Sequence, residues 1–479
     1  MMNHRYRAGL GFVLGLVATL VLFAPVNAST EQVHIERAHT QHTHTKQAQT
    51  ETSAPSQLTP ISALRLDPQQ LSTSLDEGRM AEAVLQLEQG WRQQLNEYYG
   101  RHFRTELLPP EQIAQSLQQI NQTTGQRTAL VYAVSTANQL EVVLLLPDGQ
   151  LIHHRATEAT EDAIAETIRE FRAELVRPAL PTQRYLPLAQ RLYQWMLEPL
   201  ESALEAQNID NLIFCLGGGL RGVPLAALHN GQTFLIEQYG VSIIPAFNLL
   251  DRRPANLAGA QVLAMGASEF QTQVPLPAVP VELNAITQLW PGDVSLNQEF
   301  TLENLRNLRS RQPYSIVHLA THADFAPGDV EESYIQFWNQ QLGLNQLRSL
   351  GLQSPTVELL VLSACRTAVG DPNAELGFAG LAVQSGAKSA LASLWSIPDA
   401  GTFVFMTGFY QALMDAPTKG EALRQTQLAM LQGRLTLESE SLQPVLRGLA
   451  IPEEVVQDAA TNLAHPYYWS GFTLIGNPW

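Results

Sequence analysis

The chain has 479 residues, and its 45 acidic side chains exceed its 29 basic ones, which gives a formal net charge of −16. An acidic chain without a basic cluster repels phosphate groups, so nucleic acids and anionic lipid surfaces are poor candidates for partners. Protein or peptide is therefore the natural class of substrate.

The first 28 residues have the pattern of a secretory signal peptide. A positive opening with Arg5 and Arg7 precedes a nearly uninterrupted apolar run, and Val26-Asn27-Ala28 supplies the small residues that a signal peptidase reads. We therefore expect residues 1–28 to be removed and the mature protein to be secreted or periplasmic. The apolar run of about 17 residues is at the short limit for a membrane span, so the alternative is an uncleaved N-terminal anchor.

Residues 29–60 are polar and low in complexity, with Thr, Gln, His and Ser dominating. Such a composition cannot bury enough apolar surface to offset the entropy of ordering, so we expect a disordered linker. Imidazoles at short spacing can chelate zinc or copper weakly, but a solvated linker explains the same composition without a metal. The histidines concerned are His34, His39, His42 and His44.

Residues 61–126 are predicted to form a helical N-terminal extension. Apolar side chains recur at spacings of three and four residues between 74 and 99, as on one buried face of a helix, and a second helix is expected over 110–120. Residues 75–84 resemble half of a tetratricopeptide repeat, but no second copy follows at the period of about 34 residues. We therefore interpret the extension as a cap on the domain that follows.

From about residue 127 to the end, predicted strands alternate with predicted helices. Short apolar runs rich in Val, Ile and Leu are typical of buried strands in a parallel sheet. The strands are expected at 129–134, 140–146, 211–216, 241–245, 261–266, 315–321, 335–338, 358–364 and 389–394. The helices are expected at 159–176, 186–206, 281–290, 301–307, 377–385, 402–412 and 420–433. This alternation predicts a three-layer α/β fold with a mostly parallel central sheet.

Two of these predicted strands lead into a reactive side chain. The strand at 315–321 precedes His322, and the strand at 358–364 precedes Cys365. Ligands of open α/β sheets bind at the carboxyl ends of the strands, so the imidazole could act there as the base for a thiol nucleophile. Alternatively, the cysteine is a small buried hydrophobe and the histidine a hydrogen-bonded structural residue.

Two other residues compete for these roles. His318 lies four residues before His322, and an even separation within a strand would place both on one face about 13 Å apart, so we interpret His318 as a core histidine. Cys215 ends another apolar run and could pair with Cys365 in an oxidising compartment if their Cα atoms lay within about 7 Å. Otherwise Cys215 is a buried and inert thiol.

Six segments, in order, match the motifs of one family: 212–228, 234–239, 319–323, 362–367, 386–399 and 465–472. Among them are Leu-Ala-Thr-His-Ala, Leu-Ser-Ala-Cys-Arg-Thr and Ser-Leu-Trp-Ser-Ile-Pro-Asp. On these residues the chain resembles the CHAT family, caspase-like proteins of the same clan as caspases, separases and gingipains. The resemblance implies a caspase-haemoglobinase-like fold over 127–479, with an inactive half at about 127–251 fused to a catalytic half at about 252–479.

The resemblance also implies residue roles. Cys365 would be the nucleophile and His322 the general base of a dyad that needs no metal or organic cofactor. The backbone amides of Ala323 and Cys365 would hold the oxyanion. The commonest family pattern has glycine after this histidine, and alanine keeps the N–H while adding a methyl group.

In related proteases an acidic residue selects a basic side chain before the cleaved bond. The resemblance gives this role to Asp399, with Trp395 as an apolar wall of the same pocket. The alternative is that Asp399 caps the apolar helix that follows it, because aspartate is a preferred N-cap.

We therefore expect a cysteine endopeptidase that acts on protein or peptide substrates, with a preference for a basic residue before the cleaved bond. A regulatory protein partner would be compatible with this function. The alternative is a catalytically inactive caspase-like scaffold or sensor that acts by binding other proteins.

Overall fold

The computed structural model describes residues 66–103, 105–178, 183–255, 257, 259–326, 328, 330–367, 372–459 and 462–479. At residues 364–367 and 372 the description covers the backbone only. The expected signal peptide (1–28) and linker (29–60), including its four histidines, lie outside the described residues. Within the described residues, no helix combines the length and the apolar character needed to cross a membrane.

A single sheet runs through the described part of the chain. Its strand order is β10-β9-β8-β11-β12-β13-β5-β4-β1-β2-β3, and β6 joins β8 to β7. The pairs β7–β6–β8–β11–β12 and β13–β5–β4–β1 are parallel, which confirms the mostly parallel sheet. The strands are β1 Thr128–Ser135, β2 Leu140–Leu145, β3 Leu151–Ala156, β4 Asn211–Leu216, β5 Gly240–Ile244, β6 Val262–Gly266, β7 Gly292–Leu296, β8 Ile316–Phe325, β9 Tyr334–Gln336, β10 Gln341–Gly343, β11 Leu359–Thr367, β12 Ser389–Ser393 and β13 Phe472–Gly476.

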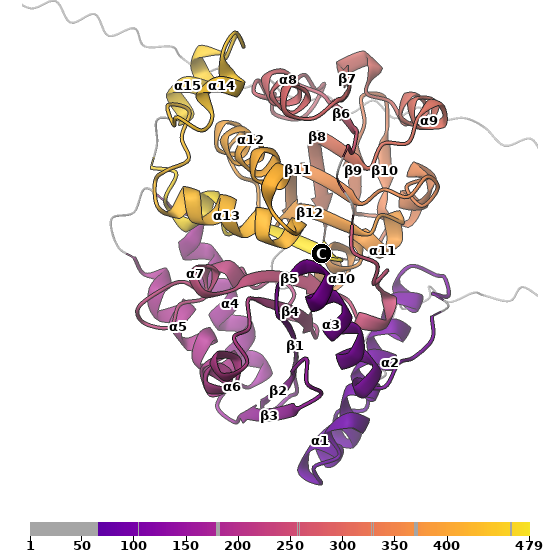
Figure 1. The fold of residues 1–479 in the computed structure, drawn as a ribbon, viewed down its shortest axis with the longest axis vertical. Coiled ribbons are helices and arrows are strands. Elements are labelled where there is room, and N and C mark those ends of the chain that lie inside the picture. The colour runs from indigo at the N-terminus through magenta and orange to yellow at the C-terminus, as the bar shows by residue number, and fades with distance from the viewer. Residues whose placement is uncertain are drawn as a thin grey trace, which may run out of the picture. The chain divides into compact units, whose positions relative to one another are not determined.

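Helices cover both faces of this sheet, which completes the expected three-layer α/β fold (Figure 1). Along β1, the side chains of Ala129 and Val131 pack in one hydrophobic core, and those of Leu130 and Tyr132 pack in another. This alternation is typical of a strand that is buried on both faces. The helices are α1 Pro68–Asp76, α2 Met80–Tyr98, α3 Pro110–Thr124, α4 Glu161–Leu175, α5 Tyr185–Met196, α6 Glu201–Ala206, α7 Leu235–Gln238, α8 Val279–Leu289, α9 Leu302–Arg311, α10 Pro372–Ala379, α11 Leu381–Ser385, α12 Asp399–Asp415, α13 Lys419–Leu431, α14 Gln443–Leu446 and α15 Glu453–Ala459.

Strand β13 joins two groups of strands. It pairs antiparallel with β12 and parallel with β5, where Ile475 lies opposite Ile243. In Figure 1 the elements before β6 occupy the lower part of the view and the later elements the upper part, with the C-terminus near their junction. The proposed division into an inactive half (127–251) and a catalytic half (252–479) stays a prediction.

Three predicted helices are interrupted in the structure, and one of them, expected over 377–385, is divided into α10 and α11 at Gly380. The helix expected from 74 is divided into α1 and α2 at Gly78, whose φ of +72° is a conformation that other residues rarely adopt. The helix expected over 186–206 is divided into α5 and α6 by the turn that contains Pro199, because proline cannot donate the hydrogen bond of a helix interior.

The helical extension is attached through a buried carboxylate. Glu88 of α2 is fully buried and accepts hydrogen bonds from the hydroxyl of Tyr132 and from the backbone amides of Phe247 and Asn248, each at 2.9 Å. Burial raises the pKa of Glu88 above its ordinary value. At its C-terminal end, α2 is followed by Tyr99, whose hydroxyl donates to the carbonyl of Gly377 in α10 at 3.1 Å. The extension therefore contacts both groups of strands or their helices, as a cap would.

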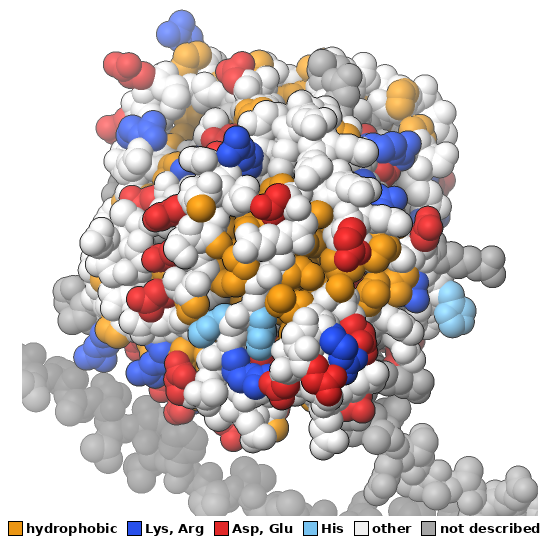
Figure 2. Space-filling view, turned by 60° about the horizontal axis from the view of Figure 1, so that its bottom comes forward, with side chains coloured by type: hydrophobic (Ala, Val, Ile, Leu, Met, Phe, Trp, Pro, Cys, Tyr) orange, Lys and Arg blue, Asp and Glu red, His pale blue; other side chains and the backbone are white. Residues whose placement is uncertain are grey.

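Acidic and basic side chains are interspersed on the face drawn in Figure 2, around a central group of hydrophobic side chains. This face carries no concentrated basic field of the kind that attracts a phosphate backbone.

Candidate active site

His322 lies where strand β8 changes partners. The first half of β8 pairs with β6, up to Ala320, and the second half pairs with β9, from Ala323. The strand continues to Phe325, four residues beyond the predicted end, so His322 stands within the strand near the carboxyl edge of the sheet. Its side chain is partly exposed there.

The imidazole of His322 is held by the loop that follows β6. Its Nε2 lies 2.8 Å from the carbonyl oxygen of Val274, and its ring packs against Phe270 with centroids 4.6 Å apart. A carbonyl oxygen can only accept a hydrogen bond, so in the neutral ring Nε2 carries the hydrogen and Nδ1 carries the lone pair. Nδ1 is therefore the nitrogen that can take a proton.

Cys365 lies on the neighbouring strand. In the parallel pairing of β8 with β11, Cys365 is opposite Ala323, and Ala364 is opposite His322. Neighbouring strands lie about 4.8 Å apart, so the fold brings the backbones of the two candidate residues together. The side chain of Cys365 lies outside the described features. The oxyanion role of the Ala323 and Cys365 amides stays a prediction.

His318 is a core histidine, as predicted. It is fully buried, with Nε2 2.8 Å from a carboxylate oxygen of Glu282 in α8 and Nδ1 3.2 Å from the hydroxyl of Tyr410 in α12. The argument that placed it on the same face as His322 is wrong. The register between β8 and β11 shifts because β8 has one more residue than β11 between Leu319 and His322, and such a bulge breaks the alternation of faces.

Asp399 is the first residue of α12, and the N-cap is Pro398, so the capping interpretation is wrong by one position. The Asp399 carboxylate instead accepts a hydrogen bond from the backbone amide of Ala278, the N-cap residue of α8. Burial raises the pKa of Asp399 to about 7, and the nearby Glu282 acts in the same direction.

The segment 274–278 thus joins the two candidate site residues. Its first residue offers a carbonyl to His322, and its last residue offers an amide to Asp399. Neither contact was predicted from the sequence, because both involve backbone groups of Val274 and Ala278. The segment follows the predicted strand at 261–266, and this position near the carboxyl edge of the sheet is the one signal that could have suggested its contacts with the site.

Trp395 has little surface to offer a substrate. It is only 5% exposed, and its indole N–H donates to the carbonyl of Tyr467 at 2.9 Å. The guanidinium of Arg172, from α4, lies 5.7 Å from the centre of its ring system. Its predicted role as a pocket wall stays a prediction.

Cys215 cannot form a disulfide with Cys365. Their strands, β4 and β11, are four positions apart in the sheet, which at about 4.8 Å per strand separates them by roughly 19 Å, far beyond the reach of a disulfide. Cys215 is a free and fully buried cysteine, and burial raises the pKa of its thiol well above the ordinary value. Cys215 is therefore a buried and inert thiol, which was the alternative to a disulfide in the sequence analysis.

The fold and these positions define a class: a mostly parallel α/β sheet with a histidine and a cysteine on adjacent strands at its carboxyl edge, as in caspase-like proteins. Residues 186–477 match the CHAT domain family, and the chain belongs to that family. No match was found among curated proteins.

The comparison with solved structures found matches of low sequence identity. The separase of Saccharomyces cerevisiae, in its complex with securin, is 9% identical with a TM-score of 0.46, over 84% of this chain and 34% of that chain. RgpB of Porphyromonas gingivalis, in the complex of its pro- and mature domains, is 12% identical with a TM-score of 0.35, over 66% of this chain and 76% of that chain. The chain thus spans about a third of the length of the separase.

Proposed function

We propose that the protein is a cysteine endopeptidase in which Cys365 and His322 form the dyad. The observation that carries the proposal is the contact between His322 Nε2 and the carbonyl of Val274, because it leaves Nδ1 as the basic nitrogen beside the strand of Cys365. Membership of a caspase-like family supports the same assignment.

In the proposed reaction, the thiol of Cys365 transfers its proton to Nδ1 of His322, and the thiolate attacks the carbonyl carbon of the peptide bond. The amides of Ala323 and Cys365 stabilise the negative oxygen of the tetrahedral intermediate. The His322 imidazolium then protonates the leaving amine as the C–N bond breaks. Water, activated by the neutral imidazole, hydrolyses the remaining thioester and restores the thiol.

Asp399 supports a preference for a basic residue before the cleaved bond. A cationic side chain near its carboxylate would favour ionisation and offset the effect of burial. The expected N-terminal signal peptide supports a site of action outside the cytoplasm, which fractionation of cells that express the full chain would test.

The test of the activity compares the protein with its Cys365→Ala variant on a mixed-sequence peptide library under reducing conditions, with cleavage read by mass spectrometry. We expect cleavage by the unsubstituted protein alone, mainly after Arg or Lys. If neither protein cleaves and Cys365 alkylates no faster than an ordinary thiol at neutral pH, a scaffold or sensor function replaces the peptidase.

A further inference from the structure

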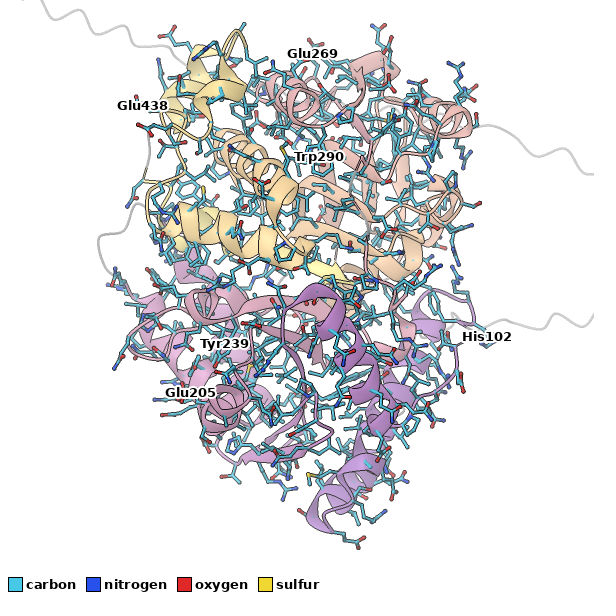
Figure 3. All side chains as sticks on the ribbon, viewed as in Figure 1. His102, Glu205, Tyr239, Glu269, Trp290 and Glu438 are labelled. Atoms are coloured by element: carbon cyan, nitrogen blue, oxygen red, sulfur yellow. The ribbon has the colours of Figure 1, made fainter. Side chains whose placement is uncertain are left out.

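A pocket of about 430 Å³ opens next to His322. One wall is the segment 269–273, which follows β6, and the other comprises Gln336 at the end of β9 and residues 338–341, the last of which begins β10. Phe270 belongs to both sites, because it lines the pocket and packs against the ring of His322. Figure 3 labels Glu269 at the start of the first wall.

The order of the strands shows on which side of His322 and Cys365 the pocket lies. Both walls extend from strands that pair on the side of β8 away from β11: β6 and β9, the latter continuing to β10. His322 on β8 therefore stands between the strand of Cys365 and the pocket. In the proposed reaction His322 protonates the leaving amine, so the chain that leaves with that amine extends from the His322 side.

We infer that this pocket binds the residues that follow the cleaved bond and favours polar, hydrogen-bonding side chains there. The inference rests on the proposed function and adds a second specificity site to it. A volume of about 430 Å³ lies within the range of small-ligand sites and is sufficient for one or two side chains.

The chemistry of the lining supports polar recognition. The exposed side-chain amides of Gln271, Asn339 and Gln340 line the pocket, and among the residues that the structure describes they have no hydrogen-bond partner. Each amide offers both a donor and an acceptor to a ligand. Trp338 supplies a flat apolar surface against which the stem of a polar side chain can pack.

Two of the glutamines hold the pocket in shape. The amide of Gln273 donates to the hydroxyl of Tyr334 at 3.4 Å, and the backbone carbonyl of Gln336 accepts a hydrogen bond from the hydroxyl of Thr321, the residue before His322, at 2.8 Å. The pocket wall and the candidate general base are thus fixed to the same stretch of β8.

The test uses three fluorogenic peptides with the same residues before the cleaved bond. One ends in a leaving dye directly after the bond, one continues with two glutamines, and one continues with two leucines. The protein is compared with the triple variant Gln271→Leu, Asn339→Leu, Gln340→Leu. The control is Gln457→Leu, an exposed glutamine of α15.

We expect the ratio of kcat/KM for the glutamine peptide to that for the dye substrate to fall about 10-fold in the triple variant, from the loss of one or two hydrogen bonds. The ratio for the leucine peptide should not fall, and the control should match the unsubstituted protein. Equal ratios in the protein and the triple variant, or an equal fall for both extended peptides, would overturn the inference.

If no substrate is cleaved, the proposed function fails, and binding then decides the inference separately. Titration of a glutamine-containing hexapeptide into the Cys365→Ala protein, followed by isothermal titration calorimetry, should show saturable binding that is lost when Trp338→Ala or the triple substitution is added. Equal affinity in all three proteins, or no binding to any, would show that the pocket is not a peptide site.

Discussion

A backbone carbonyl determines which nitrogen of His322 can accept a proton. Because Val274 supplies only an acceptor, the orientation of the imidazole does not depend on a second ionisable side chain at this position. The sequence was sufficient to predict His322 and Cys365 as site residues, because each is a reactive residue that directly follows an apolar run. It could not predict Val274, because any residue presents the same carbonyl.

The first prediction concerns this histidine. In His322→Ala, kcat should fall by a factor of about 10² to 10⁴, and alkylation of Cys365 at neutral pH should slow toward the rate of an ordinary thiol. Timed labelling with iodoacetamide and mass spectrometry would measure the second effect. His318→Gln is the matched control: it removes a buried hydrogen bond and should lower the unfolding midpoint without slowing alkylation. Equal alkylation rates in the protein and His322→Ala would count against the dyad.

The second prediction concerns Asp399. Its pKa of about 7 in the folded protein exceeds the ordinary value of 3.8, so between these pH values the folded protein retains a proton that the unfolded chain has lost. The stability that this group contributes is therefore complete below about pH 4 and is lost as the pH rises through about 7, by at most about 4 kcal/mol.

Asp399→Asn removes this titration. Urea unfolding between pH 4 and 8 should show the stability of the unsubstituted protein falling relative to that of the variant as the pH rises. Parallel pH profiles would mean that Asp399 does not hold a raised pKa. In cleavage assays, the same substitution should reduce the preference for Arg over Leu before the bond.

Among the elements, the bulge in β8 shows where sequence patterns stop being sufficient. Counting residues gives the face of a side chain only while the alternation is regular, and one additional residue between Leu319 and His322 changes it. The central strands were predictable because they are buried on both faces and continuously apolar. Strands β3, β7, β10 and β13 were not predicted: β3 carries two histidines and an arginine, β7 begins with three exposed residues, and β10 has three residues.

The attachment of α2 through Glu88 gives the third prediction. Glu88→Ala would leave the hydroxyl of Tyr132 and the amides of Phe247 and Asn248 buried without an acceptor, so the free energy of unfolding should fall by about 2–4 kcal/mol. Urea denaturation followed by circular dichroism would measure the change. Glu111→Ala, an exposed acid at the start of α3, should change stability by less than about 0.5 kcal/mol. Similar losses in both variants would contradict the importance of the buried contacts.

At the scale of the whole molecule, side chains cross between the two groups of strands. Arg172 of α4 is 3% exposed, and it donates to the carbonyl of Gly222 after β4 and to the carbonyl of Leu394 directly after β12. Burial lowers the pKa of its guanidinium to about 10. The family resemblance implied two halves, but a contact between residues so far apart in the sequence has no local pattern.

The fourth prediction tests this connection. Arg172→Lys keeps the charge but replaces the planar guanidinium with a single ammonium group, which cannot reach both carbonyls. The free energy of unfolding should therefore fall by about 2–3 kcal/mol. Thermal unfolding should remain a single transition when followed by circular dichroism and by tryptophan fluorescence. Arg169→Lys, on the exposed side of the same helix, is the control and should have little effect. Unchanged stability in Arg172→Lys would show that the contact is not needed to join the halves.

The position of β13 in the sheet has a consequence for the time course of biosynthesis. In the described part of the chain, β5 and β12 each have an edge that is covered by residues 472–476, although β5 is made more than two hundred residues earlier. Until residues 472–476 leave the ribosome, the nascent chain carries two open edges and cannot close the sheet that supports the candidate site. Completion of the fold therefore waits for these residues, and a chain truncated before residue 472 would be expected to aggregate or be degraded rather than to persist as an unregulated fragment.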